Sequence, residues 1–469
     1  MEIVADLQLH SKYSRAVSKN MDLTEISFWA GKKGIGLVAT GDWMHTLWFR
    51  EIQSQLEEVN EGIYQLKVKS QKLKVKTGIQ SERGVGDEIK FLLSAEISSI
   101  YRQGGKSHRV HTLVFAPDFS IAERINAELL KRGCNLSSDG RPIVGLSPKE
   151  IAEIVFSVNK RCLVIPAHAW TPWFSLYGFK SGFDSIDDCF GNLAGSIFAV
   201  ETGLSSDPLM NWRISELQRR AIVSFSDAHS GPKLGREATV FQEKNGMTND
   251  KLQITNFEYD DIYWAIAERY LGRNEGKLEI AYTIEFYPEE GKYHFDGHRD
   301  CGVVQSPEET RKRGTTCHVC GRPLTVGVMY RVDQLSDASL RILEALRRKD
   351  KFGVTYLSHP SDQSRPPYVM LVPLMEILSE VYHTGVSSNI ILNEYNSLIS
   401  KFGSEFDVLL RVSLPDMEHF KGERLAMAIQ RVRGGEITFH PGHDGVFGKV
   451  EIWGEGHEAP EKQMTLFSE

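Results

Sequence analysis

Residues 3–10 read Ile-Val-Ala-Asp-Leu-Gln-Leu-His, an apolar run that ends on a histidine. A short apolar run followed by a His, Asp or Glu recurs along the chain up to about residue 230. The further runs are Gly36–Asp42, Ile89–Glu96, Val110–Ala116, Cys162–His168, Ile197–Glu201 and Ala221–His229. Near-continuous apolar runs that alternate with helices are typical of a parallel sheet buried on both faces. The sequence therefore predicts an α/β protein built from seven strand–helix units.

Amphipathic segments between these runs supply the crossover helices. Leu23–Lys33, Phe119–Lys131 and Pro148–Asn159 have helical spacing of their apolar residues. Ser147 directly before Pro148 is typical of a helix start. Seven such units predict a closed or nearly closed barrel, in which functional groups gather at the C-terminal ends of the strands.

Ligand-type side chains stand at or beside these predicted strand ends. They are His10, Asp42, His45, Glu96, His108, His111, His168, Glu201, Asp227 and His229. Imidazoles and carboxylates in similar number suit Zn²⁺, Mn²⁺ or Fe. Two or three ions in one site can activate a water and neutralise both the attacking and the leaving oxygen of a phosphoester. A single histidine is more often structural, but the set as a whole favours a multinuclear metal centre.

A second group of ligand-type residues has the paired spacing of a four-coordinate structural zinc site. It consists of His298, Cys301, Cys317 and Cys320. His298 fits best as the fourth ligand, His294 is the runner-up, and His318 lies between the two later cysteines. This site is expected to stabilise folding rather than to catalyse.

Composition limits the class of protein. The chain has 469 residues, 41% hydrophobic and 25% charged, which predicts two or three globular domains. It has no apolar stretch near twenty residues and no signal-like N-terminus, so we expect neither a membrane span nor secretion. A net charge of −7 argues against charge-driven nucleic-acid binding unless the basic residues are segregated, and Lys67–Lys76 and Arg347–Lys351 are such clusters.

Three further segments are candidates for contacts with nucleic acid. Their residues are Tyr101, Arg102 and Lys106 after Glu96, Trp170 and Trp173 after His168, and Arg311, Lys312 and Arg313 near the cysteines. Aromatic side chains can stack on an extruded base, and basic ones can contact phosphates. The alternatives are core packing for the aromatic segment and a solvated face for the basic residues.

Five short segments carry a resemblance to a known superfamily. They are Asp6-Leu7-Gln8-Leu9-His10-Ser11, Thr40-Gly41-Asp42, Ala95-Glu96-Ile97, Pro166-Ala167-His168 and Ser226-Asp227-Ala228-His229. In this order they resemble the motifs of the polymerase-and-histidinol-phosphatase (PHP) superfamily. The resemblance implies a distorted (β/α)7 barrel with a trinuclear metal site that hydrolyses phosphoesters.

The resemblance also implies which residues hold each ion. His10, Glu96 and Asp227 match the ligands of one ion, Glu96, His111 and His168 those of the second, and Asp42 and His229 those of the third. His10, Glu96 and Asp227 are the expected catalytic residues. Two departures stand out: Gln8 replaces the first histidine of a His-x-His motif, and Asp42 occupies a histidine position for which His45 is the substitute. Gln8 is a much weaker ligand than imidazole.

The whole chain combines these motifs with a central zinc module and a helical C-terminal part, and over residues 1–453 it resembles the endonuclease Q family of the bacterial type. This implies a barrel at 1–285, a zinc-binding module at 286–335, a mainly helical DNA-binding domain at 336–453 and a tail at 454–469. It also implies an endonuclease that extrudes the damaged nucleotide and nicks DNA 5′ to hypoxanthine, uracil, xanthine or an abasic site. The expected cofactors are a structural Zn²⁺ and two to three divalent ions (Zn²⁺, Mg²⁺ or Mn²⁺).

The tail carries a separate resemblance. Gln463-Met464-Thr465-Leu466-Phe467 is similar to the peptide that binds the bacterial sliding clamp, in which Gln463, Leu466 and Phe467 would fill one pocket. The predicted partners are thus damaged double- or single-stranded DNA and a sliding clamp, in the cytoplasm. Two alternatives remain open at this point: a PHP-type small-molecule phosphatase, and a non-catalytic protein that binds lesions or the clamp.

Overall fold

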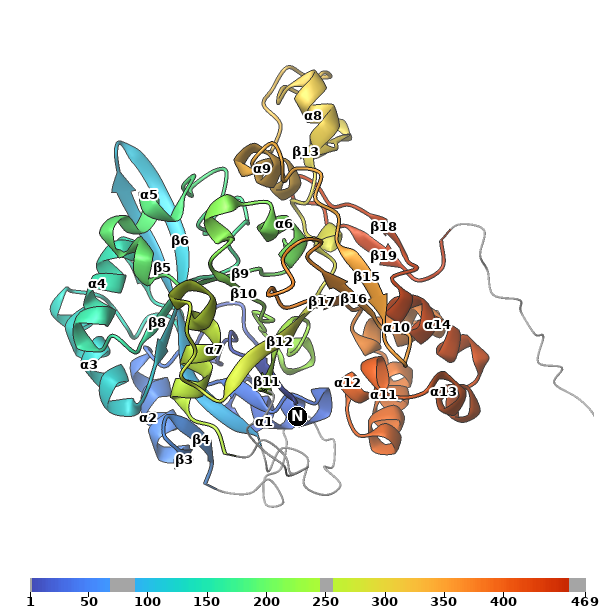
Figure 1. Cartoon of the computed structure of the whole chain (residues 1–469), viewed down its shortest axis with the longest axis horizontal. Coiled ribbons are helices and arrows are strands. Elements are labelled where there is room, and N and C mark those ends of the chain that lie inside the picture. The colour runs from blue at the N-terminus through green and yellow to red at the C-terminus, as the bar shows by residue number, and fades with distance from the viewer. Residues whose placement is uncertain (1, 68–88, 245–255, 455–469) are drawn as a thin grey trace, which may run out of the picture.

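The computed structural model describes residues 2–67, 89–244 and 256–454, and a sheet of the predicted strands forms its centre (Figure 1). Seven strands match the predicted apolar runs. They are β1 (Glu2–Asp6), β2 (Leu37–Ala39), β5 (Lys90–Gln103), β6 (Lys106–Ala116), β8 (Leu163–Pro166), β9 (Ala199–Glu201) and β10 (Ala221–Val223). Every residue of β2, β8, β9 and β10 is buried, as expected for a sheet covered on both faces. The predicted α/β fold is confirmed.

Hydrogen-bonded pairing between these strands almost closes them into a ring. β1 pairs in parallel with β2, and β2 in parallel with β5. β6 runs antiparallel to both β5 and β8, and β9 and β10 pair in parallel. Two contacts complete the ring: the Ala169 amide donates to the Glu201 carbonyl at 3.0 Å, and Leu9 bridges to Ala228. The result is a distorted, nearly closed barrel.

The reversed direction of β6 corrects the expectation of seven parallel strand–helix units. β5 and β6 form one long hairpin, with Gly104 and Gly105 at its tip in the left-handed region (φ 57° and 79°), where a Cβ would add strain. Because β6 is antiparallel, its first residues lie at the edge where the parallel strands end. His111, in the middle of β6, lies close to Glu96 in the middle of β5 and so joins the other predicted ligands.

Helices cover the barrel, and several begin on side-chain caps. The barrel helices are α1 (Leu23–Lys33), α2 (Thr46–Gln55), α3 (Phe119–Lys131), α4 (Pro148–Val158), α5 (Ile186–Phe190), α6 (Pro208–Trp212) and α7 (Tyr259–Leu271). α1 and α3 have the predicted bounds, and α4 ends one residue early. The Ser147 hydroxyl accepts from the Glu150 amide at 3.2 Å while Glu150 accepts from the Ser147 amide, which confirms the predicted cap.

The sheet continues beyond β1 into the later part of the chain, in the order β1-β11-β12-β17-β16-β15. These strands are β11 (Ala238–Glu243), β12 (Leu278–Glu285), β15 (Leu346–Lys349), β16 (Thr355–Ser358) and β17 (Tyr368–Met370). On the side of β5 the sheet is completed by β3 (Leu56–Asn60), β4 (Ile63–Leu66) and β7 (Ile143–Val144). The first part of the segment predicted to be mainly helical thus belongs to the sheet.

A small module projects above the barrel in Figure 1. It contains β13 (Asp296–His298), β14 (Val303–Gln305), α8 (Pro307–Arg313) and α9 (Val328–Leu335). Val303, Cys317 and Leu324 form a small apolar cluster of their own within it. A hydrogen bond links the module to the barrel: Arg331 Nε on α9 donates to the Tyr177 carbonyl at 2.9 Å.

The C-terminal part packs beside the barrel, at the right of Figure 1. It consists of α10 (Leu374–Val381), α11 (Asn389–Phe402), α12 (Glu405–Leu410), α13 (Leu414–Lys421), α14 (Glu423–Gly434), β18 (Thr438–His440) and β19 (Lys449–Glu451). A buried ion pair of 2.7 Å between Lys33 and Glu405 joins α12 to α1. The hairpin of β18 and β19 confirms the two strands predicted around the turn-rich segment 440–445.

Two predictions concern residues outside this description. The clamp-like peptide Gln463–Phe467 and most of the lysine cluster Lys67–Lys76 lie outside the described residues. Within the described ranges, no helix combines the length and the apolar run that crossing a membrane requires.

Candidate active site

Glu96 on β5 is the centre of a buried cluster at the edge of the barrel. Its Oε2 lies 3.2 Å from His10 Nε2, and its Oε1 contacts His111 Nδ1 and lies 3.5 Å from His168 Nε2. Asp227 Oδ1 lies 3.1 Å from His10 Nε2. Segments that are far apart in the sequence thus bring five predicted ligands to one place.

The ligand atoms fall into two sets. One set is His10, Asp227 and His229, and the other is Glu96, His111 and His168. Within each set, ligand atoms lie within 4.8 Å of one another. This arrangement suits two neighbouring divalent ions, with Glu96 placed between the sets because it also contacts His10.

Buried polar atoms in the cluster show that the residues present fit a cation. Gln8 Oε1 is buried without a hydrogen-bond partner among the described residues. His10 Nε2 lies 3.1 Å from Asp227 Oδ1 and 3.2 Å from Glu96 Oε2, but neither His10 Nε2 nor Asp227 Oδ1 makes a hydrogen bond of good geometry among the described residues. Leaving such an atom unsatisfied costs about 1–3 kcal/mol, and a bound cation would satisfy them. Gln8 also donates from Nε2 to Glu96 Oε2 at 2.9 Å, so its amide holds the central carboxylate and leaves only its oxygen as a weak ligand.

The charges of the cluster depend on one another. Burial by itself lowers the pKa of His10, but Asp42 and the contacts with Asp227 and Glu96 outweigh it and raise this pKa well above its usual value. Burial raises the pKa of Glu96, but neighbouring groups outweigh it and hold this pKa well below its usual value. Burial lowers the pKa of the neighbouring His111 to about 4, so Arg141 and His10 are the groups that carry the positive charge. Ionised carboxylates are thus maintained here by adjacent positive charge, which a divalent cation also supplies.

Asp42 belongs to neither ligand set and instead contacts the imidazole of His10. Its Oδ1 lies 3.0 Å from His10 Nδ1, while its Oδ2 accepts from the Ser11 amide at 2.6 Å and from the Ser14 hydroxyl at 2.8 Å. A carboxylate behind a histidine ligand fixes the orientation and tautomer of the imidazole. This differs from the prediction that Asp42 and His229 share a third ion, because His229 lies in the set of His10 and Asp227.

His45 is a helix cap, which corrects its prediction as a metal ligand. Its Nδ1 accepts from the Trp48 amide at 3.4 Å at the start of α2, and its Nε2 lies 3.3 Å from the Ser137 carbonyl oxygen. Its ring also stacks on Tyr13 at 4.5 Å between centroids. Both ring nitrogens are therefore engaged away from the ligand sets.

Asp42→Asn tests the orienting role of this carboxylate. An asparagine keeps the size of the side chain but removes the charge that holds the His10 imidazole, so we expect a loss of about 10- to 100-fold in divalent-metal affinity. Titration of metal into the purified variant and the wild type, followed by calorimetry, measures this change. Equal affinities would show that Asp42 has no such role.

Three site residues adopt a backbone conformation that is uncommon outside glycine. Asp42, His168 and Asp227 have φ of 45°, 30° and 48°. Such residues cost free energy and tend to cluster at functional sites. At His168 the neighbours maintain this conformation: the Glu201 carboxylate accepts from its amide, and a Cβ on Gly203 would lie 2.3 Å from the His168 Cβ.

Arg141 belongs to the site and was not among the predicted residues. Its Nη1 lies 3.4 Å from Glu96 Oε1. The close approach of its loop requires Gly140, because a Cβ there would lie 2.3 Å from Asp42 Oδ2. A guanidinium at the edge of a carboxylate cluster suits a phosphate oxygen. The one local signal for it is the turn-forming sequence Asp139-Gly140-Arg141.

A cavity of about 610 Å³ opens beside the two ligand sets. His168 and Asp227 line it on the side of the barrel. Its other described lining includes the basic residues Lys233, Arg236 and Lys292, the acidic residues Glu290 and Glu376, and the aromatic residues Phe286, Tyr293 and Phe447; Lys233 pairs with Glu376 at 3.3 Å. Cationic and aromatic groups together suit a nucleotide, which offers a phosphate and a base. The sequence could not reveal these residues as a group, because they come from segments that meet only in the fold.

The predicted aromatic contacts separate into two kinds. Trp173 is half-buried and meets Tyr293 of the cavity edge at 5.3 Å between ring centroids. Trp170 is 1% exposed, stacks on Tyr177, and donates from Nε1 to Asn211 Oδ1 at 2.8 Å. Trp170 is therefore a core residue, which corrects its prediction as a DNA contact.

The polar residues after Glu96 lie on the β5–β6 hairpin. Arg102 and Lys106 are exposed near its tip, where a duplex could reach them. Tyr101 is half-buried and stacks on His108, which in turn stacks on Phe183, so these rings form an internal column. Arg102 and Lys106 remain candidate phosphate contacts.

The basic residues of the zinc module lie on α8. Arg311, Lys312 and Arg313 are all exposed. Arg311 pairs with Asp333 on α9, and Arg313 lies 3.6 Å from Glu309 on its own helix. Lys312 has no ion pair among the described residues. The module therefore presents positive charge to solvent that is partly neutralised within the module.

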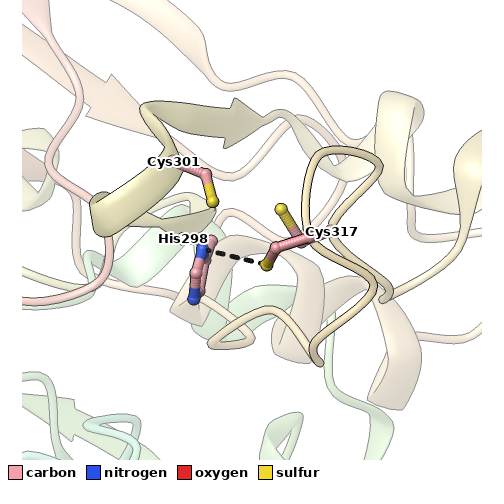
Figure 2. Close-up of side chains that lie close together, drawn as sticks. His298, Cys301 and Cys317 are labelled. Atoms are coloured by element: carbon pink, nitrogen blue, oxygen red, sulfur yellow. Dashed lines mark hydrogen bonds between the residues drawn. The ribbon is translucent and has the colours of Figure 1, made fainter.

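The four predicted zinc ligands converge in the projecting module. The ligand atoms of His298, Cys301, Cys317 and Cys320 lie within 4.8 Å of one another, and Figure 2 shows His298, Cys301 and Cys317 pointing toward a common centre. Backbone and side-chain hydrogen bonds from Arg322 lower the pKa of the Cys320 thiol to about 6, which favours the thiolate that a metal binds. This donor set fits tetrahedral zinc.

Comparison with known proteins supports these observations. The model of the MJ0043 C-terminal domain family matches residues 373–436, which span the C-terminal helices. The chain is 29% identical over 301 residues to the uncharacterized protein MJ0043 of Methanocaldococcus jannaschii, a match that covers 64% of this chain and 33% of that protein. This chain thus spans about a third of the length of that relative.

Two crystal structures match almost the whole chain. The lesion-specific endonuclease PfuEndoQ from Pyrococcus furiosus has a TM-score of 0.75 at 28% identity, covering 96% of this chain and 95% of that one. An endonuclease Q complex with a 27-mer duplex substrate and an abasic lesion at the active site has a TM-score of 0.74 at 28% identity, covering 96% of each chain. In fold and in sequence this chain is therefore similar to endonuclease Q over nearly its entire length, as its motifs predict.

Proposed function

We propose that this protein is a metal-dependent DNA repair endonuclease that nicks the strand on the 5′ side of a damaged nucleotide. The observation that carries the proposal is the pair of ligand sets at the wall of a nucleotide-sized cavity. It occurs in a chain that is similar over 96% of its length to a lesion-specific endonuclease. The expected cofactors are two divalent ions in the barrel and one zinc in the projecting module.

Different residues of the chain would bind the metal ions, contact the phosphate and position the ligands. Divalent ions held by the two ligand sets would activate a water and offset the charge on the leaving oxygen. Arg141 beside Glu96 and Arg236 on the cavity wall would contact the phosphate oxygens, as would Lys233 if the phosphate displaced Glu376, with which it pairs at 3.3 Å. Asp42 fixes His10, so the cluster is positioned before the substrate arrives.

Burial of the cluster favours a substrate nucleotide that has left the helix. His10 and Glu96 are only 1% and 2% exposed, so a phosphate within an undistorted duplex would be held away from them. The adjacent cavity offers space for the extruded nucleotide. Deaminated bases such as hypoxanthine, uracil and xanthine pair poorly and an abasic site lacks a base, so extrusion costs less at these lesions.

We also propose that the peptide Gln463–Phe467 docks this cytoplasmic repair protein on a sliding clamp through Gln463, Leu466 and Phe467. The support for this is its sequence pattern at the end of a polar segment. The peptide lies outside the described residues.

A panel of substrates tests the proposed activity. Duplexes that contain hypoxanthine, uracil, xanthine, an abasic site or no lesion are incubated with the full chain and Mg²⁺ or Mn²⁺, and p-nitrophenyl phosphate is included as a small phosphomonoester. We expect nicking of the damaged strands, at least about tenfold faster than of the undamaged duplex, because extrusion of a paired base costs a few kcal/mol. Preferred turnover of the phosphomonoester would favour a phosphatase, and lesion binding without any hydrolysis would favour a non-catalytic protein.

A further inference from the structure

Phe447 is a large apolar side chain that stands out from the surface beside the cavity. It is 69% exposed, and its neighbour Val446 is 42% exposed. Both lie in the turn between β18 and β19. Phe447 and the next residue, Gly448, also line the cavity that contains His168 and Asp227. An exposed aromatic ring thus stands at the edge of the candidate active site.

The turn that carries Phe447 is hydrogen-bonded to the backbone of Glu289 and Glu290. The Gly442 amide donates to the Glu289 carbonyl at 2.8 Å, and the Gly448 amide donates to the Glu290 carbonyl at 3.1 Å. These two bonds flank Phe447 on both sides. A Cβ on Gly448 would lie 2.0 Å from the Glu289 carbonyl oxygen, so the close approach requires glycine at this position.

The tip of the turn has a defined shape. Asp444 and Gly445 have φ of 42° and 85°, and the His443 amide donates to the Val446 carbonyl at 3.1 Å, as in a two-residue hairpin turn of the primed type. The Gly445 amide donates to the Lys292 carbonyl at 3.0 Å. The turn is therefore held in place before any partner binds, which lowers the entropic cost of using Val446 and the adjacent Phe447 in a contact.

The surroundings of Phe447 suit a nucleic acid. Lys292 Nζ lies 4.4 Å from the centroid of the Phe447 ring and lines the same cavity, as do Arg236, Lys233, Glu290 and Glu376. Lys233 pairs with Glu376 at 3.3 Å, so Lys292 and Arg236 are the cations left for a phosphate. Cationic groups around an aromatic ring offer contacts to phosphates and to a base at the same time. Trp173, a predicted DNA contact near this edge, is half-buried against Tyr293, so Phe447 is the more exposed of these two rings.

We propose that Phe447 is a wedge that enters the base stack of duplex DNA at the lesion, while the damaged nucleotide occupies the cavity. The inference rests on the proposed function and adds a residue that enforces extrusion. An apolar side chain inserted between bases replaces part of the stacking that extrusion removes and prevents the nucleotide from returning. A single strand has no stack of paired bases to hold open, so the wedge acts on duplex substrates.

Phe447→Ala tests this role. We expect the variant to lose roughly 10- to 100-fold in kcat/KM on a duplex with one abasic site, the size of a lost aromatic stacking contact. On the same lesion strand as a single-stranded oligonucleotide, the loss should stay within about twofold. Phe439→Ala is the matched control, because Phe439 is 45% exposed on the same hairpin and is not among the described residues that line the cavity. Equal losses on duplex and single strand, or an equal loss in Phe439→Ala, would overturn the proposal.

A fluorescence measurement of DNA binding tests the wedge role of Phe447 separately from the proposed endonuclease activity. 2-Aminopurine is placed next to the abasic site, and its fluorescence is measured with Asp227→Asn, which holds the duplex uncut. We expect a rise on binding that Phe447→Ala in the same background removes. A rise that persists without Phe447 would refute the wedge even if the wild type nicks DNA. A rise that depends on Phe447, together with no nicking by the wild type, would retain the wedge and refute the endonuclease.

Discussion

Asp227→Asn is expected to reduce nicking of an abasic duplex by about 10³-fold or more while leaving DNA affinity within a few-fold. Asp227 Oδ1 lies 3.1 Å from His10 Nε2 and belongs to the ligand set of His10 and His229. An amide cannot replace the charge of this carboxylate, so one ion is lost or misplaced. Lewis-acid activation by such an ion is worth several kcal/mol, which corresponds to the stated loss. Single-turnover cleavage and fluorescence anisotropy measure the two quantities.

The control for this variant removes the charge of a carboxylate that belongs to neither ligand set. Asp260 lies in the first turn of α7, where it pairs with Arg161 at 2.9 Å. Asp260→Asn should leave cleavage unchanged within about twofold, since an exposed ion pair contributes little. An Asp227→Asn protein with wild-type activity would refute the assignment of the ligand sets.

Cys317→Ser is expected to remove one zinc per chain and to unfold the projecting module. Cys317 is 1% exposed and belongs to the small apolar cluster of the module with Val303 and Leu324. A cluster of this size cannot order a module by itself, whereas a structural zinc contributes roughly 10 kcal/mol or more. Metal analysis of the purified protein and hydrogen exchange over residues 296–335 measure these effects. Loss of the module should also weaken DNA binding.

Cys134→Ser is the matched control for the zinc site. Cys134 is half-buried directly after α3, and the cysteine-rich ligand group does not include it. This variant should keep the zinc content of the wild type and the slow exchange of the module. A Cys317→Ser protein with full zinc content and an ordered module would show that these cysteines are not structural ligands.

The fold was predictable from the sequence because its signals are local. A buried strand needs a near-continuous apolar run, so each predicted run became a strand. Ser147 before Pro148 marked the start of α4, which begins at Pro148 as predicted and ends one residue early. The direction of β6 was not predictable, because Val110–Ala116 reads the same in a parallel and an antiparallel strand. The pairing of β17 with β12, and of β16 and β15 beyond it, was not predictable, since strands of three or four residues far along the chain carry no sign of their partner.

The candidate site was predictable only where its residues lie at or near the end of a predicted apolar run. His10, Glu96, His168 and Asp227 have such positions and meet in the structure, although β5 continues past Glu96 to Gln103. His45 was mistaken for a ligand because a histidine that caps a helix looks the same in sequence.

Other site residues depend on contacts that only the fold creates. Arg141 reaches Glu96 because Gly140 lets its loop close over Asp42. Phe447 reaches the cavity because its turn is bound to the segment around Glu289 and Glu290. Residues of this kind are separated by long stretches of sequence and lack a common motif.

One measurement tests the central claim most directly: mapping the cut in a 5′-labelled duplex that contains one abasic site. With a divalent metal and the wild-type protein, we expect a single product that ends at the phosphodiester immediately 5′ to the lesion and carries a 3′-hydroxyl. The product should be absent without the metal and absent from the undamaged duplex. Cleavage at another position, equal cleavage of the undamaged strand, or an intact lesion strand would contradict a metal-dependent lesion endonuclease.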